Sequence, residues 1–397
     1  MRIVAVDPVA SENSESHRLS LKDSDFNDAS VAEMVLPCNS LNETLDFFVG
    51  RLGFDLVSIS PADDPTRAVL WGYGLRIRLE RDASGTPGSL CLYLKDAEAV
   101  VGSDRKFLAP NGTKIEIVEQ AEEGRRLFPA PSFSLCRHAD NSLWREGRAG
   151  MRYRDLIPER QGGRLIASHI RILEGGPVAD YAHFHNIEFQ MIYCYKGWVR
   201  VVYEDQGPSF VMEEGDCVLQ PPQIRHQVLE CAPGLEVVEI TCPAEHETYT
   251  AGESVLPTPE LNPERSFCGQ RFIRHESKHA ASNVSWLSGF ECRETSISTG
   301  SANFACVRVL RQVEPSEVFL HNYEGELSFF FLLKGAMTLH TAGQPDARLG
   351  EADAFVIPAG LNFAFFDSTD GLELLEVTLP GQAQFKRHSP IPSPMSR

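Results

Sequence analysis

Alternation of apolar and polar residues dominates the chain from residue 161 onward. Two long stretches, 161–250 and 300–383, consist of short apolar runs separated by Gly, Pro and acidic turns. Many short runs with this spacing predict successive β-strands, and such a succession is typical of barrels and sandwiches. We therefore expect a mainly β protein whose C-terminal part holds two jelly-roll β-barrels.

Residues 31–120 show a different order of elements. Ala32–Cys38 predicts a strand, Ser40 can cap a helix with apolar positions as far as Phe48, and Gly53 ends it. The runs that follow predict further strands at 54–59, 68–70, 75–79, 90–94 and 113–118. The predicted module is therefore βαβββ, a strand and a helix followed by several strands.

The remaining segments lack strong periodicity. We expect residues 1–30 to be a flexible tail, 121–160 a connector, 251–299 a linker and 384–397 a second tail. Six arginines lie between Arg137 and Arg160. They are expected to be solvated or salt-bridged, and the alternative is that one or two contact an anionic group of a substrate.

The two β-rich stretches are internal repeats of about 140 residues. Five features recur at nearly the same spacing in 161–250 and 300–383. The pairs are His183 with His321, Glu188 with Glu326, Lys196-Gly197 with Lys334-Gly335, Gly215-Asp216 with Ala352-Asp353, and Pro221 with Pro358. A duplicated barrel follows from this repeat.

Charge and composition narrow the classes of partner. The 397 residues carry a formal net charge of -18 and form no basic stripe, so we expect neither nucleic acid nor an anionic membrane as partner. No apolar run approaches the roughly 20 residues that span a bilayer, and residues 1–27 lack an apolar signal core. Ten scattered cysteines without a C-x-x-C pair indicate reduced thiols, as in a cytoplasmic protein.

Three histidines carry the candidate chemistry. His183 and His185 stand two residues apart on a predicted strand, so their side chains project from the same face. His226 follows the Gly215-Asp216 turn and Pro221, on what we expect to be a neighbouring strand. Three imidazoles can hold Fe, Ni, Mn, Cu or Zn and leave positions open for a substrate. The alternative is a metal-free barrel whose histidines line a cavity.

Both histidine segments resemble the two motifs of the cupin superfamily. The resemblance implies a cupin barrel over 161–250 with His183, His185 and His226 as metal ligands, and a degenerate barrel over 300–383. The family's usual glutamate is Gln190 here, so three readings stay open: Gln190 coordinates weakly, Glu188 takes its place, or the site has three histidines. In the second repeat the corresponding residues are His321, Tyr323, Ser328 and Phe363.

Residues 31–120 resemble one module of the vicinal oxygen chelate family, the glyoxalase and bleomycin-resistance group. The matching segments are the Leu41–Phe48 helix, Leu52-Gly53-Phe54, and 110–117. The resemblance implies ligands on the first and last strands, where Glu33 and Glu116 form a possible second, weak site for Mg or Mn. Because the family usually builds its cavity from two modules, we expect a homodimer.

Taken together, these resemblances predict that the protein is a metal-dependent dioxygenase-type oxidoreductase. It would act on a small oxygenated organic substrate, and Fe(II) is the favoured metal. Glu188 and Gln190 are the expected catalytic residues that tune the site or move protons. Tyr181, Tyr193 and Arg225 are expected to contact substrate. Two alternatives remain: a metal-dependent isomerase, epimerase or lyase that does not use O₂, and a non-catalytic small-molecule binding protein.

Overall fold

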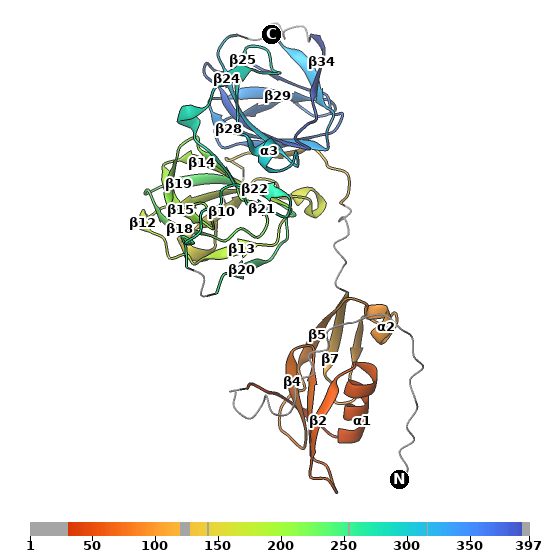
Figure 1. Ribbon diagram of the computed structural model, residues 1–397. Helices are drawn as coiled ribbons and strands as arrows, with labels where there is room; N and C mark the ends of the chain where they lie inside the picture. Colours follow the sequence, from red (N-terminus) through yellow and green to blue (C-terminus); the bar gives the residue numbers. More distant parts are fainter. Residues whose placement is uncertain (1–30, 120–127, 141–142, 253–254, 316, 391–397) are drawn as a thin grey trace, which may run out of the picture. The chain divides into compact units, whose positions relative to one another are not determined.

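The computed structural model describes residues 31–119, 128–140, 143–252, 255–315 and 317–390. The chain divides into two compact units, Met1–Arg126 and Leu127–Arg397. β-Strands dominate both units (Figure 1), so the prediction of a mainly β protein is confirmed. The predicted tail 1–30 lies outside the described residues. No helix in the described ranges is both long and apolar enough to cross a membrane.

The first unit begins with a strand, a helix and three more strands. Helix α1 is continued by a π-helical turn, and Phe48 and Leu52 of this region are fully buried. The four strands form one sheet in the order β1-β4-β3-β2, with β1 parallel to β4. The elements are β1 (Met34–Cys38), α1 (Leu41–Asp46), the π-turn (Phe47–Arg51), β2 (Asp55–Ser60), β3 (Arg67–Gly72) and β4 (Leu75–Arg81).

The predicted final strand of this module belongs to a separate sheet. Strands β5 (Ser89–Leu94), β7 (Lys114–Glu119) and β6 (Lys106–Leu108) pair in that order, and α2 (Ala97–Val101) follows β5. The strand predicted at 113–118 is present as β7, but it belongs to a second sheet of the same unit. Apolar faces of both sheets and of both helices share one core. The apolar residues that alternate along the predicted strands are therefore buried.

The second unit contains the first of the two predicted barrels, built from two sheets. The larger sheet has the order β23-β17-β14-β19-β11-β10-β9, and the smaller has the order β16-β15-β18-β13-β20. The strands are β9 (Arg145–Glu146), β10 (Arg152–Asp155), β11 (Ile166–Ile172), β12 (Gly176–Pro177), β13 (His183–His185), β14 (Phe189–Lys196), β15 (Trp198–Tyr203), β16 (Phe210–Glu213), β17 (Cys217–Leu219), β18 (His226–Cys231), β19 (Leu235–Cys242), β20 (Thr248–Thr250) and β23 (Ile273–His275).

The second barrel repeats this plan with sheets β24-β25-β26-β33-β28-β31-β8 and β30-β29-β32-β27-β34. Its strands are β8 (Ser134–Cys136), β24 (Ser282–Val284), β25 (Phe290–Glu294), β26 (Cys306–Gln312), β27 (Phe319–Tyr323), β28 (Leu327–Lys334), β29 (Met337–Thr341), β30 (Ala347–Leu349), β31 (Ala354–Pro358), β32 (Phe363–Phe366), β33 (Glu373–Leu379) and β34 (Phe385–Pro390). The short helix α3 (Ile297–Gly300) precedes β26, and a hairpin of β21 (Ser266–Phe267) and β22 (Gln270–Arg271) precedes β23.

The described parts of the segments predicted as connector, linker and C-terminal tail contribute strands to the barrels. From 121–160, β8 joins the second barrel while β9 and β10 join the first. From 251–299, β23 extends the first barrel and β24 and β25 extend the second. From 384–397, β34 pairs with β27. These strands are short or irregular in sequence, so their tertiary partners rather than their periodicity determine them.

The larger sheets of the two barrels pack face to face. Along β14, the odd-numbered residues from Phe189 to Tyr195 bury their side chains against the second barrel, while Ile192 and Cys194 face the interior of their own barrel. Phe331 of the second barrel lies edge-on to Tyr195, with ring centroids 5.1 Å apart. Both faces of β14 are therefore buried, which explains its nearly continuous apolar sequence.

Candidate metal centre

The three predicted histidines meet inside the first barrel. His183 and His185 lie on β13, and His226 is the first residue of β18, directly opposite His183 in the antiparallel pairing. Their candidate ligand atoms all lie within 4.8 Å of one another, and all three residues are buried. Among the described residues this is the one cluster of three His, Cys, Asp or Glu side chains that can hold a metal ion. The side chains therefore converge as their spacing along the strands predicted.

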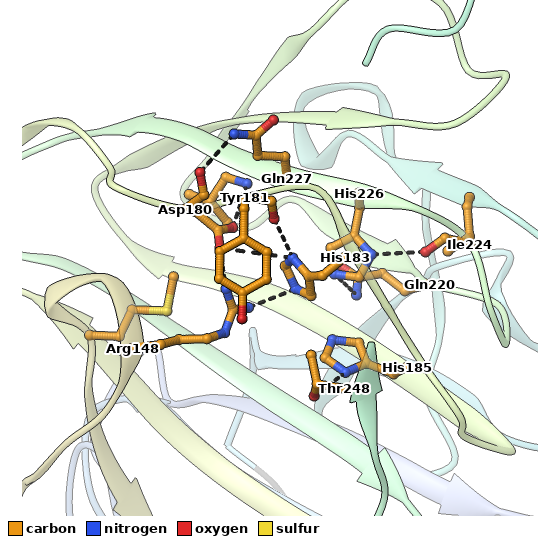
Figure 2. A network of polar contacts seen from close by, with 12 residues as sticks. Arg148, Asp180, Tyr181, His183, His185, Gln220, Ile224, His226, Gln227 and Thr248 are labelled. Atoms are coloured by element: carbon orange, nitrogen blue, oxygen red, sulfur yellow. Dashed lines mark hydrogen bonds and ion pairs between the residues drawn. The ribbon is translucent and has the colours of Figure 1, made fainter. Parts of the chain in front are cut away.

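Hydrogen bonds to backbone carbonyls determine which ring nitrogen carries the proton in His183 and His226. The Nδ1 of His183 lies 2.7 Å from the Tyr181 carbonyl oxygen, and that of His226 lies 3.0 Å from the Ile224 carbonyl oxygen. A carbonyl only accepts, so both Nδ1 atoms carry the proton and both Nε2 atoms present a lone pair. Thr248 Oγ1 lies 2.9 Å from His185 Nδ1 (Figure 2), a contact in which the hydroxyl can donate or accept. Hydrogen bonds of this kind, made by the ring nitrogen that faces away from the ion, orient histidines that ligate metals.

All three imidazoles are neutral at neutral pH. Burial lowers the pKa of His185 to about 3, with the neighbouring His183 lowering it further. Burial and the other two histidines hold the pKa of His226 well below its usual value. Burial and the nearby Arg148 guanidinium lower the pKa of His183. Neutral imidazoles are the form that binds a metal, so no proton has to be displaced first.

Arg148 reaches the same point from outside the barrel strands. Its Nη2 lies 2.7 Å from His183 Nε2, and its Nη1 forms an ion pair with the buried Asp180 carboxylate. Asp180 in turn accepts a hydrogen bond from the Val228 backbone N–H at 3.0 Å. Figure 2 shows the guanidinium between Asp180 and His183. A cation therefore competes with any metal ion for the His183 lone pair.

Gln190 lies in a chain of buried hydrogen bonds beside the histidines. Gln220 donates from Nε2 to Gln190 Oε1 at 2.9 Å and accepts from the Tyr203 hydroxyl at 2.6 Å. The same Gln220 nitrogen lies 3.3 Å from His226 Nε2. Gln190 also bonds to the Glu239 carboxylate. Because the amide oxygen of Gln190 already accepts a hydrogen bond, this arrangement favours the three-histidine reading and gives Gln190 an orienting role.

Glu239 is a cavity residue that the sequence reasoning missed. It lies on β19, on the face that also carries Leu235 and Val237 toward the barrel interior. Burial raises its pKa to about 7, although Arg148 and the hydrogen bond from Gln190 lower it. A carboxyl group with a pKa near neutrality can both hold and release a proton. The available signal was a glutamate at an inward position of the otherwise apolar run Leu235–Cys242.

The second barrel carries an equivalent glutamate, Glu376, whose carboxylate accepts hydrogen bonds from two side chains. Ile192 pairs with Glu239 in the first barrel, and the corresponding Phe330 pairs with Glu376 in the second. Glu376 accepts hydrogen bonds from Trp286 Nε1 at 2.6 Å and from Arg308 at 2.9 Å. Both barrels thus carry a glutamate at this position, and the one in the first barrel, Glu239, lines the cavity beside the histidines.

The cavity at the histidines is small and largely apolar. Its volume is about 70 Å³, room for a few water molecules or part of a small ligand. Side chains such as Ile170, Met212 and Val237 form its walls. The polar groups that line it are Arg148, His185, His226, Gln220, Gln227 and Glu239. The site therefore suits a ligand with one polar end and an apolar body.

The other predicted residues separate into one that lies at the site and three that do not. Tyr181 is half exposed, and its ring centroid lies 5.8 Å from that of His183. Glu188 instead pairs with Arg164 at 3.0 Å, because β14 begins only at Phe189 and the expected alternation does not extend back to it. Tyr193 faces the second barrel, an odd number of residues from Gln190. Arg225 pairs with Glu204, outside the cavity.

The second barrel lacks the histidine set, as its sequence predicted. His321 pairs with Phe363 in the register in which His183 pairs with His226, so the strand pairing agrees with the alignment of the repeats. Tyr323 donates from its hydroxyl to the Pro380 carbonyl oxygen at 2.8 Å. Aromatic rings fill the space instead, with Trp286 stacked on Phe385 at 3.8 Å.

The proposed weak site in the first unit receives no support. Glu33 lies 3.0 Å from Arg76 Nε and 3.3 Å from Arg78 Nε, and Glu116 lies 2.7 Å from Lys106 Nζ. The two carboxylates thus have cationic partners of their own. The sheet order also puts Glu116, on β7, in a different sheet from the one that Glu33 borders.

Comparison with known proteins finds relatives only by structure. No family model and no curated protein matches the chain. A mutant of the oxalate decarboxylase of Bacillus subtilis is 14% identical over 66% of this chain and 80% of its own, with a TM-score of 0.48. Oxalate decarboxylase of Lactobacillus farciminis is 12% identical over 66% and 90%, with a TM-score of 0.49. Salicylate 1,2-dioxygenase of Pseudaminobacter salicylatoxidans is 14% identical over 57% and 75%, with a TM-score of 0.44.

Proposed function

We propose that the chain is a metal-dependent dioxygenase-type oxidoreductase acting on a small oxygenated organic molecule. The observation that carries the proposal is the convergence of three neutral, buried imidazoles, two of which, His185 and His226, line a largely apolar cavity. Arg148 Nη2 and Gln220 Nε2 lie 2.7 Å and 3.3 Å from the Nε2 atoms of His183 and His226, the atoms that a metal ion would bind. Three nitrogen donors leave coordination positions for exogenous ligands.

The residues present fit a divalent transition metal, with Fe(II) favoured. His183, His185 and His226 would hold it through Nε2, because hydrogen bonds occupy their Nδ1 atoms. When bound, the ion supplies Lewis acidity and, for a redox-active metal, electron transfer between substrate and O₂. Nitrogen donors alone make Mg²⁺ or Ca²⁺ a poor match, since both prefer oxygen ligands.

The surrounding side chains have separate roles in this proposal. Arg148 leaves His183 and binds the negatively charged or polarised oxygen of the substrate, which is the group that a guanidinium recognises best. Tyr181 covers the outer side of the site. Glu239 holds or accepts the proton of a substrate hydroxyl, and Gln190 keeps its carboxylate in place. The apolar walls exclude water from the reacting group.

Glu239 also favours a second candidate function. A carboxyl group with a pKa of about 7 beside a metal site suits enolisation, so an isomerase, epimerase or lyase that works without O₂ fits the same geometry. The two candidates differ in what they consume. Only the first takes up O₂, and only the second exchanges a substrate proton with solvent without O₂ uptake.

The experiment begins with the metal. Purified full-length protein is expected to bind about one equivalent of transition metal per chain, and His183→Ala and His226→Ala are expected to bind none. His321→Ala removes an equally buried histidine of the second barrel and should leave the metal content unchanged. Loss of metal in His321→Ala with retention in His226→Ala would overturn the assignment of the site.

Assays of the iron-loaded protein with candidate substrates distinguish the two reaction classes. Catechols, diketones and 2-hydroxy ketones are offered in turn, while O₂ uptake and deuterium incorporation from D₂O are measured. O₂ consumption that His226→Ala abolishes supports the dioxygenase. Deuterium incorporation without O₂ uptake establishes the second candidate in its place. Saturable binding of these compounds without turnover of any of them would leave only a binding protein.

A further inference from the structure

A second, larger pocket lies outside the first barrel, on the side where the two barrels meet. Its volume is about 690 Å³, within the range of small-molecule sites. One wall is Leu135–Arg137, at and just beyond β8 of the second barrel's sheet, and the floor is the face of β10 and β11 that carries Asp155, Ser168 and Ile166. Elements of both barrels therefore build it, which is a common position for ligand sites.

Cationic side chains dominate the polar lining of this pocket. Arg137, Arg145 and Arg160 line it, together with Asp140 and Asp155. Arg160 lies 3.4 Å from Asp155, so those two charges offset each other. Among the described residues, Arg137 and Arg145 form no ion pair, and the buried Arg137 Nε has no hydrogen-bond partner. Once Arg160 and Asp155 are set aside, the charged groups that line the pocket are Arg137, Arg145 and Asp140, with a formal net charge of +1.

Most of the described arginines form an ion pair, whereas Arg137 and Arg145, which line the same pocket, do not. The chain has 55 acidic and 37 basic residues, so carboxylates are in excess. Arginines close to the pocket in sequence, such as Arg148 and Arg152, do have carboxylate partners. A buried guanidinium nitrogen without a partner is unfavourable unless something binds it. The ligand expected at Arg137 and Arg145 is therefore an anion.

The other walls indicate what that anion carries. Leu135, Pro158 and Ile166 line the pocket, and Leu143 at its rim is 78% exposed. An exposed leucine beside two free guanidinium groups suits a ligand with an apolar body and a charged head. A net charge of +1 matches a monoanion better than a dianion such as phosphate.

We propose that this interbarrel pocket binds a small organic monoanion, a carboxylate with an aromatic or branched apolar body. Arg137 and Arg145 bind the carboxylate, and the leucine and proline side chains cover the apolar part. The site is separate from the histidine cluster and does not depend on the function proposed above. Tyr153 lines both this pocket and the histidine cavity, so the two sites share one side chain as a wall.

Calorimetric titration of the full-length protein with benzoate, acetate and inorganic phosphate tests the proposal. Benzoate is expected to bind more tightly than acetate, because acetate lacks the apolar body, and more tightly than phosphate, because of the charge balance. The double variant Arg137→Gln/Arg145→Gln should weaken benzoate binding at least about tenfold, the effect expected for losing charge-assisted hydrogen bonds. Both side chains are partly accessible, and an unchanged melting temperature will show that the variant is folded.

Two controls separate this pocket from other places where an anion can bind. Arg387→Gln removes an arginine that lies over Phe319 in the second barrel, and it should leave benzoate affinity unchanged. His183→Ala disables the metal centre and should also retain benzoate binding, whether or not the proposed function is correct. Undiminished binding in the double variant, an equal loss in Arg387→Gln, or tighter binding of phosphate than of benzoate would each overturn the proposal.

Discussion

At the scale of single residues, the hydrogen-bond and ion-pair partners of each side chain determine which atoms are available to bind a ligand. Backbone carbonyls fix the protons of His183 and His226, so the free nitrogens are directed to a common point. Glu188 looks like a catalytic base in the sequence, but in the structure it shares Arg164 with Glu326, its counterpart in the second repeat. The two equivalent glutamates thus bind one arginine, Arg164, between the barrels.

Removing Arg148 is expected to strengthen metal binding. In Arg148→Gln the guanidinium no longer donates to His183 Nε2, so a divalent cation meets neither a competitor nor a like charge there. The affinity should rise by on the order of tenfold, measured by competition with a coloured chelator. Arg152→Gln, which removes an exposed arginine paired with Glu146, should leave it unchanged. Weaker binding in Arg148→Gln would show that the arginine supports the site instead of blocking it.

Glu239 should make the stability of the metal-free protein fall as the pH rises from about 4.5 to about 7. Its folded pKa is raised, so the folded state binds more protons than the unfolded state in this window. Glu239→Gln removes this dependence, so the variant should gain on the order of 3 kcal/mol relative to wild type between those pH values. Urea unfolding at several pH values measures the difference.

Glu236 on the same strand serves as a control, because its pKa is lowered and that of Glu239 is raised. The imidazole of His169 and its hydrogen bond lower the pKa of Glu236 against the effect of burial. Its stabilising contribution is present above its unfolded pKa and is lost as the pH falls through the folded pKa. Glu236→Gln should therefore destabilise the protein at neutral pH. If Glu239→Gln also destabilised the protein at pH 7, the conclusion that burial raises the pKa of Glu239 would be wrong.

At the scale of elements, pairing partners override local pattern. Residues 384–397 contain prolines and little periodicity, yet β34 forms an edge of the second barrel. Phe385 of β34 stacks on Trp286 and lies 4.9 Å from the Tyr323 ring. The same stack fills the space that the histidines occupy in the first barrel. Aromatic rings thus form a packed core in the second barrel at the place where the first barrel carries imidazoles.

Phe385→Ala is expected to destabilise the second barrel by about 2 kcal/mol, since it removes a partly buried ring from that stack. Thermal unfolding followed by tryptophan fluorescence reports the change, because Trp286 is the stacking partner. Lys386→Ala, the neighbouring substitution, removes only an exposed ion pair with Glu324 and should cost well under about 1 kcal/mol. Equal effects of the two variants would show that β34 contributes no packing.

At the scale of the molecule, Leu127–Arg397 behaves as one structural unit with a core between its barrels. That core joins residues of both larger sheets, including Phe189, Tyr195, Phe329 and Phe331. Neither barrel can therefore be removed without exposing a large apolar face of the other. The first unit, Met1–Arg126, has its own core.

Truncation tests this division. A chain beginning at Leu127 is expected to fold and to retain the full metal content, because the histidine site lies wholly within that unit. A shorter chain of residues 127–279 keeps the histidines but exposes the core between the barrels, so it should aggregate or melt far lower. Elemental analysis and thermal unfolding of both chains measure these outcomes. A stable, metal-binding 127–279 would show that the second barrel is dispensable.

The sequence by itself determined the β-rich architecture, the duplicated barrel and the three histidines, because these depend on local periodicity and on fixed spacings along strands. The even spacing of His183 and His185, for example, sets their common face wherever the strand lies. Only the tertiary structure decided what surrounds them. Arg148 arrives from a preceding segment and Glu239 from a distant strand, while Glu188 and Tyr193 turn toward the other barrel. Proximity across the fold depends on strand pairing over long separations, and no local pattern encodes it.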